Sequence, residues 1–439
     1  MKKALLLLYS FLFIISCQQD DSFNKNSSYS YKGEKVWSKT FGGSNDETVK
    51  SVISTQDGGF LVIGYTKSND GDIVDANDNI EDAWLSKFDI EGNLLWSKTY
   101  GGSLDDYSYS AVEMDNGEIV VAGYSKSTDG DVPSNLGMHD FFVFKISLSG
   151  ELIWSKTYGY TSHDHAHKII KTSDNGLFVV GFTDYSGGIG DRSILHGVGE
   201  FYGMKLDSNG NMLWDTFFGG TQNDRVFDVV EANDGGYVMV GYSESNDYDA
   251  IDNHGSYDYW VVKVNSSGNL MWKKSYGGSD LDQAYGISKT NSGNYLIVGT
   301  SSSLDGDVSN HISGNDVWVI AIDDNGHLIW EKSYGGTQYE TVNSIKKLKN
   351  DSFVIVGHTR SDDGDVKNLK GENDFWVLNI DSGGKLIWEN TFGGSNFDFG
   401  YDFTELNDNS LIIVGESQSN DLDVSENKGM KDLLVIKVK

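Results

Sequence analysis

A stretch of seven residues near the amino terminus, Trp37 to Gly43, returns six more times along the chain. Its tryptophans recur at steps of 59, 58, 60, 58, 58 and 58 residues, at Trp37, Trp96, Trp154, Trp214, Trp272, Trp330 and Trp388. A fixed period near 58 residues is typical of stacked or ring-closed units, since a unit of that size cannot bury its own apolar face. The repeat therefore constrains the fold strongly and says little about a ligand.

Each repeat contains four short segments with the character of β-strands. In the first complete unit they are residues 47–55, 60–65, 83–88 and 94–100. Asp57-Gly58-Gly59 lies between the first two, and Asp-Gly between apolar runs favours a hairpin because both residues tolerate positive φ. Four antiparallel strands in each of seven units predict an all-β fold, a seven-bladed β-propeller.

Two further columns of the repeat predict tight packing. Glycine recurs in every unit at Gly64, Gly123, Gly181, Gly241, Gly299, Gly357 and Gly415, where a side chain would collide with a neighbouring strand or blade. The tryptophans outside the first column all fall in the third strand, at Trp84, Trp260, Trp318 and Trp376. We interpret both tryptophan columns as packing residues rather than sugar-binding platforms.

The two ends of the repeat array are out of phase. The seventh unit ends at Lys439 after its third strand, while residues 33–37 match residues 150–154, which lead into a fourth strand. The first strand of the domain should therefore complete the last blade and so remove the open strand edges. We predict that the propeller spans residues 33–439.

Over residues 33–439 the repeat resembles a bacterial family, the seven-bladed bacterial propeller (SBBP-type) repeat. The resemblance rests on Gly42-Gly43-Ser44, the acidic residue after it, Asp57-Gly58-Gly59, Gly64-Tyr65-Thr66 and Ser68-Asn69-Asp70-Gly71-Asp72. It implies a secreted or surface protein and leaves the activity open. The third unit departs from the pattern at Gly159-Tyr160 and in residues 187–191.

The amino terminus has the features of a lipoprotein signal. Two lysines precede an apolar stretch, residues 4–15, that is too short to span a bilayer. Residues 14–17 resemble a bacterial lipobox ending at Cys17, the only cysteine, and residues 18–21 resemble the acidic tract of Bacteroidetes surface lipoproteins. We predict a signal peptide at residues 1–16, a lipidated Cys17 with a tether at residues 17–32, and an outer-membrane lipoprotein exposed at the cell surface.

Acidic residues recur at two places in the repeat. One stands at the crossover into every unit: Glu47, Asp106, Asp164, Asp224, Asp282, Glu340 and Asp398. Sevenfold repetition predicts carboxylates that accept backbone N–H bonds, with a ring of cation ligands as the alternative. Six units carry Asp-x-Asp between the second and third strands, beginning at Asp70, Asp129, Asp247, Asp305, Asp363 and Asp421. We interpret these as turn residues, and calcium binding stays open as a cofactor alternative.

The least similar positions are 46, 48 and 50 and their equivalents, at the entry to each inner strand. They include Tyr107, Tyr109, His163, His165, His167, Arg225, Phe227, Gln283, Tyr285, Tyr339, Phe397, Phe399 and Tyr401. Crossovers and long loops of a propeller open on one face, so these side chains either make a ligand surface or plug the channel mouth. We select nine as ligand-binding candidates: Tyr107, Tyr109, His163, His165, His167, Arg225, Phe227, Tyr285 and Tyr401.

Three alternating histidines, His163, His165 and His167, are the sharpest departure from the repeat. Alternating residues on a strand point to one face, which suits metal ligands, and imidazole can serve as a general base. Residues so close in sequence converge on one ion only with difficulty unless another blade supplies a partner, so we assign neither a metal nor a catalytic role. No Ser-His-Asp order, phosphate loop or cysteine-rich cluster supports a hydrolase, nucleotide-binding or zinc-finger function.

These observations favour a monomeric binding protein with an extracellular glycan or another envelope protein as its partner. The formal net charge of −31 argues against nucleic acid and anionic lipid, so the lipid anchor is the one membrane contact that we expect. One alternative is a polysaccharide lyase that uses His and Tyr as base and acid, for which Arg225 is the only cation among the selected positions. A structural scaffold without a small ligand is the other alternative.

Overall fold

The computed structural model describes residues 31–74, 76, 80–184, 197–312 and 314–439. These residues form β-strands joined by turns and loops, with no helix among them. None of them belongs to a helix that is long and apolar enough to cross a membrane. The predicted signal peptide, Cys17, the acidic tract and the departure at residues 187–191 lie outside the described residues.

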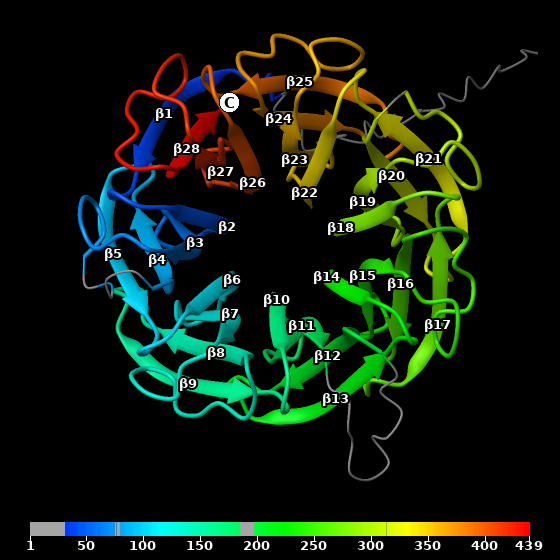
Figure 1. Ribbon diagram of the computed structural model, residues 1–439, viewed down its shortest axis with the longest axis horizontal. Helices are drawn as coiled ribbons and strands as arrows, with labels where there is room; N and C mark the ends of the chain where they lie inside the picture. Colours follow the sequence, from blue (N-terminus) through cyan, green and yellow to red (C-terminus); the bar gives the residue numbers. More distant parts are fainter. Residues whose placement is uncertain (1–30, 75, 77–79, 185–196, 313) are drawn as a thin grey trace, which may run out of the picture.

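Seven antiparallel sheets of four strands surround a central channel, which confirms the predicted propeller (Figure 1). The innermost strands are β2 (Glu47–Ser54), β6 (Asp106–Glu113), β10 (Asp164–Lys171), β14 (Asp224–Glu231), β18 (Asp282–Lys289), β22 (Glu340–Lys347) and β26 (Asp398–Glu405). The second strands are β3 (Phe60–Thr66), β7 (Ile119–Ser125), β11 (Leu177–Thr183), β15 (Tyr237–Ser243), β19 (Tyr295–Ser301), β23 (Phe353–Thr359) and β27 (Leu411–Ser417).

The outer half of each blade consists of two further strands. The third strands are β4 (Asp82–Phe88), β8 (Asp140–Ile146), β12 (Glu200–Leu206), β16 (Asp258–Val264), β20 (Asp316–Ile322), β24 (Asp374–Ile380) and β28 (Asp432–Val438). The outermost strands are β5 (Leu94–Tyr100), β9 (Leu152–Tyr158), β13 (Met212–Phe218), β17 (Leu270–Tyr276), β21 (Leu328–Tyr334), β25 (Leu386–Phe392) and, in the last blade, β1 (Lys35–Phe41).

The ring closes as the sequence predicts, because β1 pairs with β28 and completes the last blade. The backbone of Glu34 adds two hydrogen bonds with Lys439, of 3.1 and 3.0 Å. Tyr31, which we expected in the tether, is 5% exposed and packs in the core of the last blade. Ordered packing therefore begins before the predicted boundary at residue 33.

The apolar core lies between neighbouring blades. One cluster joins Val238 and Val240 of the fourth blade to Trp318 and Ile320 of the fifth. The tryptophans of the third strands are at most 1% exposed, and those of the outermost strands pack against the next blade: the ring of Trp37 lies 2.4 Å from where a Cβ on Gly92 would stand. Both tryptophan columns are packing residues, as predicted.

Every inner strand carries a β-bulge at the same place. In β2 the pairing with β3 shifts between Val49 and Ser51, so Lys50 has no partner of its own. The equivalent shifts occur in all six other inner strands. A Cβ on Gly64 would stand 2.0 Å from the carbonyl oxygen of Thr48 on the bulged strand, which explains the glycine column.

The crossover acids accept backbone hydrogen bonds, as the repeat predicts. In each blade the backbone N–H of the residue four positions earlier donates to the carboxylate. The donor and acceptor pairs are Gly43 and Glu47 (2.9 Å), Gly102 and Asp106 (2.7 Å), Tyr160 and Asp164 (2.6 Å), Gly220 and Asp224 (2.8 Å), Gly278 and Asp282 (2.7 Å), Gly336 and Glu340 (2.8 Å), and Gly394 and Asp398 (2.7 Å). Asp70 accepts from the backbone N–H of Ser44 at 2.7 Å, which fastens the long loop to the crossover. Crossovers and long loops therefore share one face, which we call the crossover face.

Candidate functional site

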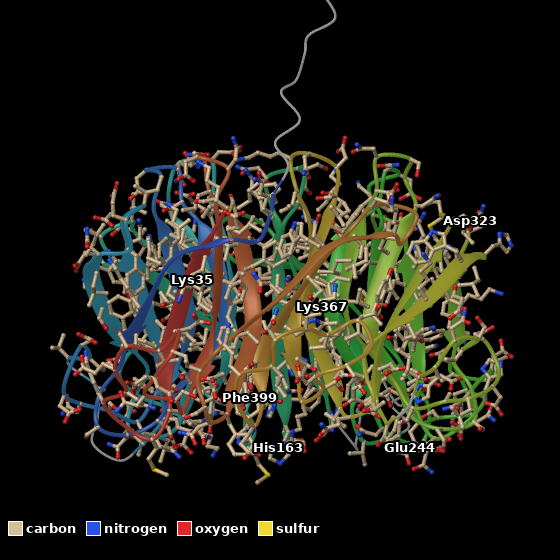
Figure 2. The ribbon with its side chains drawn as sticks, turned by 90° about the horizontal axis from the view of Figure 1, so that it is seen from above. Lys35, His163, Glu244, Asp323, Lys367 and Phe399 are labelled. Atoms are coloured by element: carbon tan, nitrogen blue, oxygen red, sulfur yellow. The ribbon has the colours of Figure 1, made fainter. Side chains whose placement is uncertain are left out.

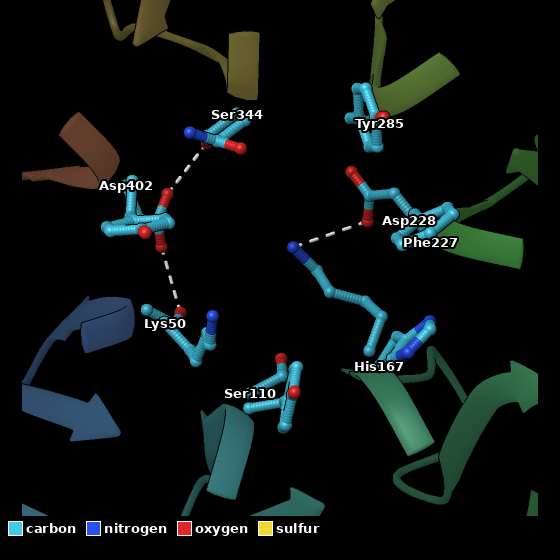
Figure 3. A pocket seen from close by; sticks show the side chains of 13 residues that line it. Lys50, Ser110, His167, Phe227, Asp228, Tyr285, Ser344 and Asp402 are labelled. Carbon is cyan, nitrogen blue, oxygen red and sulfur yellow. Dashed lines mark hydrogen bonds and ion pairs between the residues drawn. The ribbon is translucent and has the colours of Figure 1, made fainter. Parts of the chain in front are cut away.

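The channel holds a cavity of about 200 Å³, lined by residues from the middle of the inner strands. Its wall is the bulged residue of each inner strand: Lys50, Tyr109, His167, Phe227, Tyr285, Asn343 and Tyr401. A bulge re-aims its side chain, and all seven bulged residues line this cavity. Figure 3 shows four of them, Lys50, His167, Phe227 and Tyr285, around it. Five of the nine residues selected from the sequence line this cavity.

Aromatic rings form a continuous arc along one side of the wall. The ring of Tyr109 lies 5.6 Å from His167, and His167 stacks on Phe227 at 4.8 Å with 13° between their planes. Phe227 then meets Tyr285 edge to face at 5.2 Å. The N–H of His167 Nδ1 donates to the carbonyl of Val226 at 2.8 Å, which leaves Nε2 with its lone pair.

Lys50 is the cation of the wall, and the sequence analysis overlooked it. Its ammonium lies 5.7, 5.4 and 5.0 Å from the ring centroids of Tyr65, Tyr109 and Tyr401. Among the described residues no carboxylate or hydrogen-bond acceptor pairs with it. Burial lowers the pKa of Lys50 below its ordinary value. An anionic group entering the cavity would therefore meet a poorly solvated ammonium, which Glu416 and Glu81 attract without forming an ion pair with it.

The floor of the cavity is polar and internally paired. Lys168 contacts Asp228 at 3.2 Å, and Lys346 contacts Asp402 at 2.7 Å. Asp402 also accepts from the hydroxyl of Ser344 at 2.7 Å (Figure 3). Both lysines are paired with carboxylates of the protein, whereas Lys50 has no such partner in the described part of the chain.

A second tier of rings surrounds the cavity at the rim. Tyr124 stacks on Tyr107 at 4.4 Å and on His165 at 3.7 Å. The guanidinium of Arg225 lies 3.5 Å from the ring centroid of Phe182 and pairs with Asp184 at 3.1 Å. Tyr107 donates a hydrogen bond to Glu81. The predicted residues Tyr107, His165 and Arg225 thus belong to one rim cluster.

The structure corrects the prediction that the three histidines share one face. The bulge in β10 interrupts the alternation after Ala166, so His167 turns into the cavity. His163 and His165 lie instead with His139, which precedes β8 in the neighbouring blade. Burial lowers the pKa of His139 and of His167 to about 4, and that of His165 to about 2, so all three rings are neutral at pH 7.

Sequence reasoning missed several residues for identifiable reasons. Lys50 occupies one of the variable positions compared from the sequence, but it was not selected because aromatic residues and histidines dominate those positions. His139 belongs to a column that was not compared, the residue before the third strand, and Tyr124 and Phe182 come from the second strands. An alignment of the seven units over all columns would have found His139 and Lys50, whereas the contacts of Tyr124 require the structure.

Comparisons with known proteins support the fold and leave the activity open. No family model matches the chain. Regulatory protein FlaEY of Caulobacter vibrioides is 25% identical over 230 residues, which are 48% of this chain and 24% of that protein. The chain thus spans about a quarter of the length of this curated relative.

Solved structures show the same architecture at low sequence identity. A streptogramin B lyase structure superposes with a TM-score of 0.51 at 11% identity, covering 91% of this chain and 97% of that one. The Pan2 WD40 domain of Neurospora crassa also reaches 0.51, at 10% identity and 89% of both chains. At this identity the likeness shows a propeller fold and nothing about the reaction or partner.

Proposed function

We propose that this protein is an extracellular binding propeller that takes an acidic sugar residue of a glycan into the cavity of its channel. The observation that carries the proposal is Lys50, an ammonium without a carboxylate partner among the described residues, set between three tyrosine rings. A carboxylate would pair with the ammonium through a charge-assisted hydrogen bond, while the apolar face of the sugar packs on the rings.

The dimensions of the cavity favour a sugar over a folded partner. At about 200 Å³ it is smaller than typical ligand pockets, so it suits one residue of a chain rather than a protein surface. An envelope protein would instead bind across the rim and leave the cavity unused.

The orientation of the propeller agrees with a surface lipoprotein, which is the second part of the proposal. Tyr31 donates a hydrogen bond to Glu405, the last residue of β26, at the end of this strand away from the crossover face. His163 and Phe399 lie at one face, and Asp323 lies at the opposite face (Figure 2). A lipid on Cys17 would therefore leave the crossover face pointing away from the membrane. Replacement of Cys17 by Ser should release the protein from the membrane fraction, and unchanged fractionation would contradict the anchor.

The binding proposal is tested with a panel of uronate-containing and neutral polysaccharides. We expect binding of an acidic member, weakened at least about 10-fold by Lys50→Met, since hydrogen bonds to charged groups contribute about 1.5–3 kcal/mol. Lys274→Met is the matched control, because it removes the same charge from an exposed site on β17. Equal affinity of the Lys50→Met variant and the wild type would contradict the proposal.

A polysaccharide lyase is the second candidate function, and Lys50 favours it too. Beta-elimination needs a cation on the uronate carboxylate, a base for the C5 proton and an acid for the leaving oxygen. Lys50, neutral His167 and Tyr109 stand together in the wall and could fill these roles. The C4–O bond breaks as the C4–C5 double bond forms, so the unsaturated product absorbs in the ultraviolet. Binding without growing absorbance would leave the binding function and exclude the lyase for that substrate.

A further inference from the structure

Three imidazoles from two blades converge at one edge of the rim cluster, and one of them is His165, a member of that cluster. His139 lies just before β8 of the second blade, His163 just before β10 of the third, and His165 within β10. Nδ1 of His139 is 2.6 Å from Nε2 of His165 and 3.1 Å from Nδ1 of His163. One nitrogen from each ring falls within 4.8 Å of the other two.

Hydrogen bonds cannot account for this convergence. A neutral imidazole nitrogen has either one proton or one in-plane lone pair, so Nδ1 of His139 serves one neighbour well and leaves the other close contact unsatisfied. An ion could instead accept the lone pair of one unprotonated nitrogen from each ring. We infer that His139, His163 and His165 form a binding site for a divalent transition metal of the zinc type, held between the second and third blades.

The distances agree with such a site after small rotations of the rings. Bonds of about 2.0–2.1 Å hold the nitrogens about 3.3 Å apart in a tetrahedral zinc complex. The separations of 2.6 and 3.1 Å require two pairs of nitrogens to open by less than 1 Å, while the third pair, which lies within 4.8 Å, must close by at most about 1.5 Å. Imidazole nitrogen selects zinc, copper or nickel over calcium and magnesium, which prefer oxygen.

The backbone beneath the histidines is fixed by the fold. His139 and His163 form a parallel bridge, in which Asp164 N–H donates to the carbonyl of His139 at 2.8 Å. The same bridge recurs at other blade junctions, between Asp46 and Lys431, Val198 and Asn223, Tyr257 and Leu281, Asn315 and Tyr339, and Asn373 and Phe397. Histidine occupies both sides at this junction, and Tyr124 stacks on His165 to hold the third ring. Ligands on rigid strand ends keep a preformed geometry.

Among the described residues the site presents three protein ligands, and no fourth His, Cys, Asp or Glu joins them. Asp105 and Asp184 are close enough to act on His139, but Asp105 pairs with Lys126 at 2.7 Å and Asp184 with Arg225 at 3.1 Å. Three histidines with an open position is an arrangement of catalytic rather than structural zinc. The open position would take water or an oxygen of a molecule bound at the rim. This inference does not depend on the glycan proposal.

The test measures Zn²⁺ binding to the full chain by calorimetry, with Co²⁺ as a spectroscopic probe of coordination by nitrogen. We expect one ion per chain and a rise in melting temperature with Zn²⁺. His139→Ala and His163→Ala should each weaken binding by more than about 100-fold, since loss of an outer-shell contact alone costs about 10–100-fold.

His327→Ala is the matched control, because His327 is exposed in the turn before β21 and contacts Asp323 rather than the cluster. Its affinity for Zn²⁺ should equal that of the wild type. Melting curves without metal show whether each variant is folded, and an unfolded variant is replaced by His139→Gln or His163→Gln. A folded cluster variant that binds Zn²⁺ as tightly as the wild type would overturn the inference, as would a wild type that binds no ion.

Discussion

The crossover acids and the bulged residues lie three positions apart on the same strands, yet the acids are alike in all seven blades and the bulged residues differ. The acid accepts a backbone N–H in all seven blades, while the bulged residue is Lys50 in one blade, His167 in another and Phe227 in a third. The acid holds the turn from which each strand starts, so its replacement destabilises the blade. The bulged side chain contacts the cavity, so it is free to differ. Function is therefore expected where the seven copies disagree.

The largest predicted effect comes from breaking the uniform scaffold at its seam. A chain that begins at Asn45 lacks β1, which exposes the edge of β28 and removes Trp37 from its packing. The loss of this tryptophan alone should cost about 3–5 kcal/mol, and the open edge should promote association. Denaturant unfolding and gel filtration measure both effects. A monomer with the wild-type midpoint would show that the clasp contributes nothing.

A pair of neighbouring substitutions in the fifth blade compares a crossover acid with a residue of a variable column. Asp282→Ala leaves the N–H of Gly278 and the hydroxyl of Ser303 without an acceptor, at about 1–3 kcal/mol for each unsatisfied group. Gln283→Ala, one residue on, changes a half-buried side chain whose amide accepts from Tyr285, and should stay within about 0.5 kcal/mol. Equal losses in urea unfolding would refute the division.

The smallest predicted effect is on the pH dependence of stability. It arises from a second buried acid, which stands at the start of each third strand. Burial, with a smaller contribution from Glu340, raises the pKa of Asp316 to about 7 from 3.8. The folded chain then holds this proton more tightly than the unfolded chain, so its contribution to stability falls as pH rises from about 4 to about 7. Asp316→Asn should therefore raise the melting temperature more at pH 8 than at pH 5.5, by a few degrees at most.

The wild type should show the opposing effect of its buried histidines at lower pH. Burial lowers the pKa of His167 and His358 from 6.5 to about 4, so their contribution is complete above pH 6.5 and is lost as pH falls toward 4. The histidine contribution therefore opposes that of the buried acids between pH 6.5 and 4, and substitution separates the two: relative to the wild type, His358→Gln should be more stable at pH 4.5 than at pH 7. Melting temperatures of the two proteins that differ by the same amount at both pH values would contradict the assigned shift.

The candidate site was predictable in part. The variable columns pointed to Tyr109, His167 and Phe227, which do line the cavity. They could not show that His167 and His165 diverge, because the pairing of β10 with β11 shifts between Ala166 and Lys168. Strand alternation assumes a regular pleat, and a bulge breaks it.

The sequence by itself determined the number of blades, the strand order within a blade and the closing of the ring. These follow from local periodicity and from the phase of the repeat, since each unit must bury its apolar faces against the next. Only the tertiary structure decided that Lys50 stands among three tyrosines and that His139 meets His163 and His165. Such contacts join different blades, and the distance between two side chains across a blade junction depends on the bulges and on the curvature of the whole ring. No pattern within one unit encodes that distance.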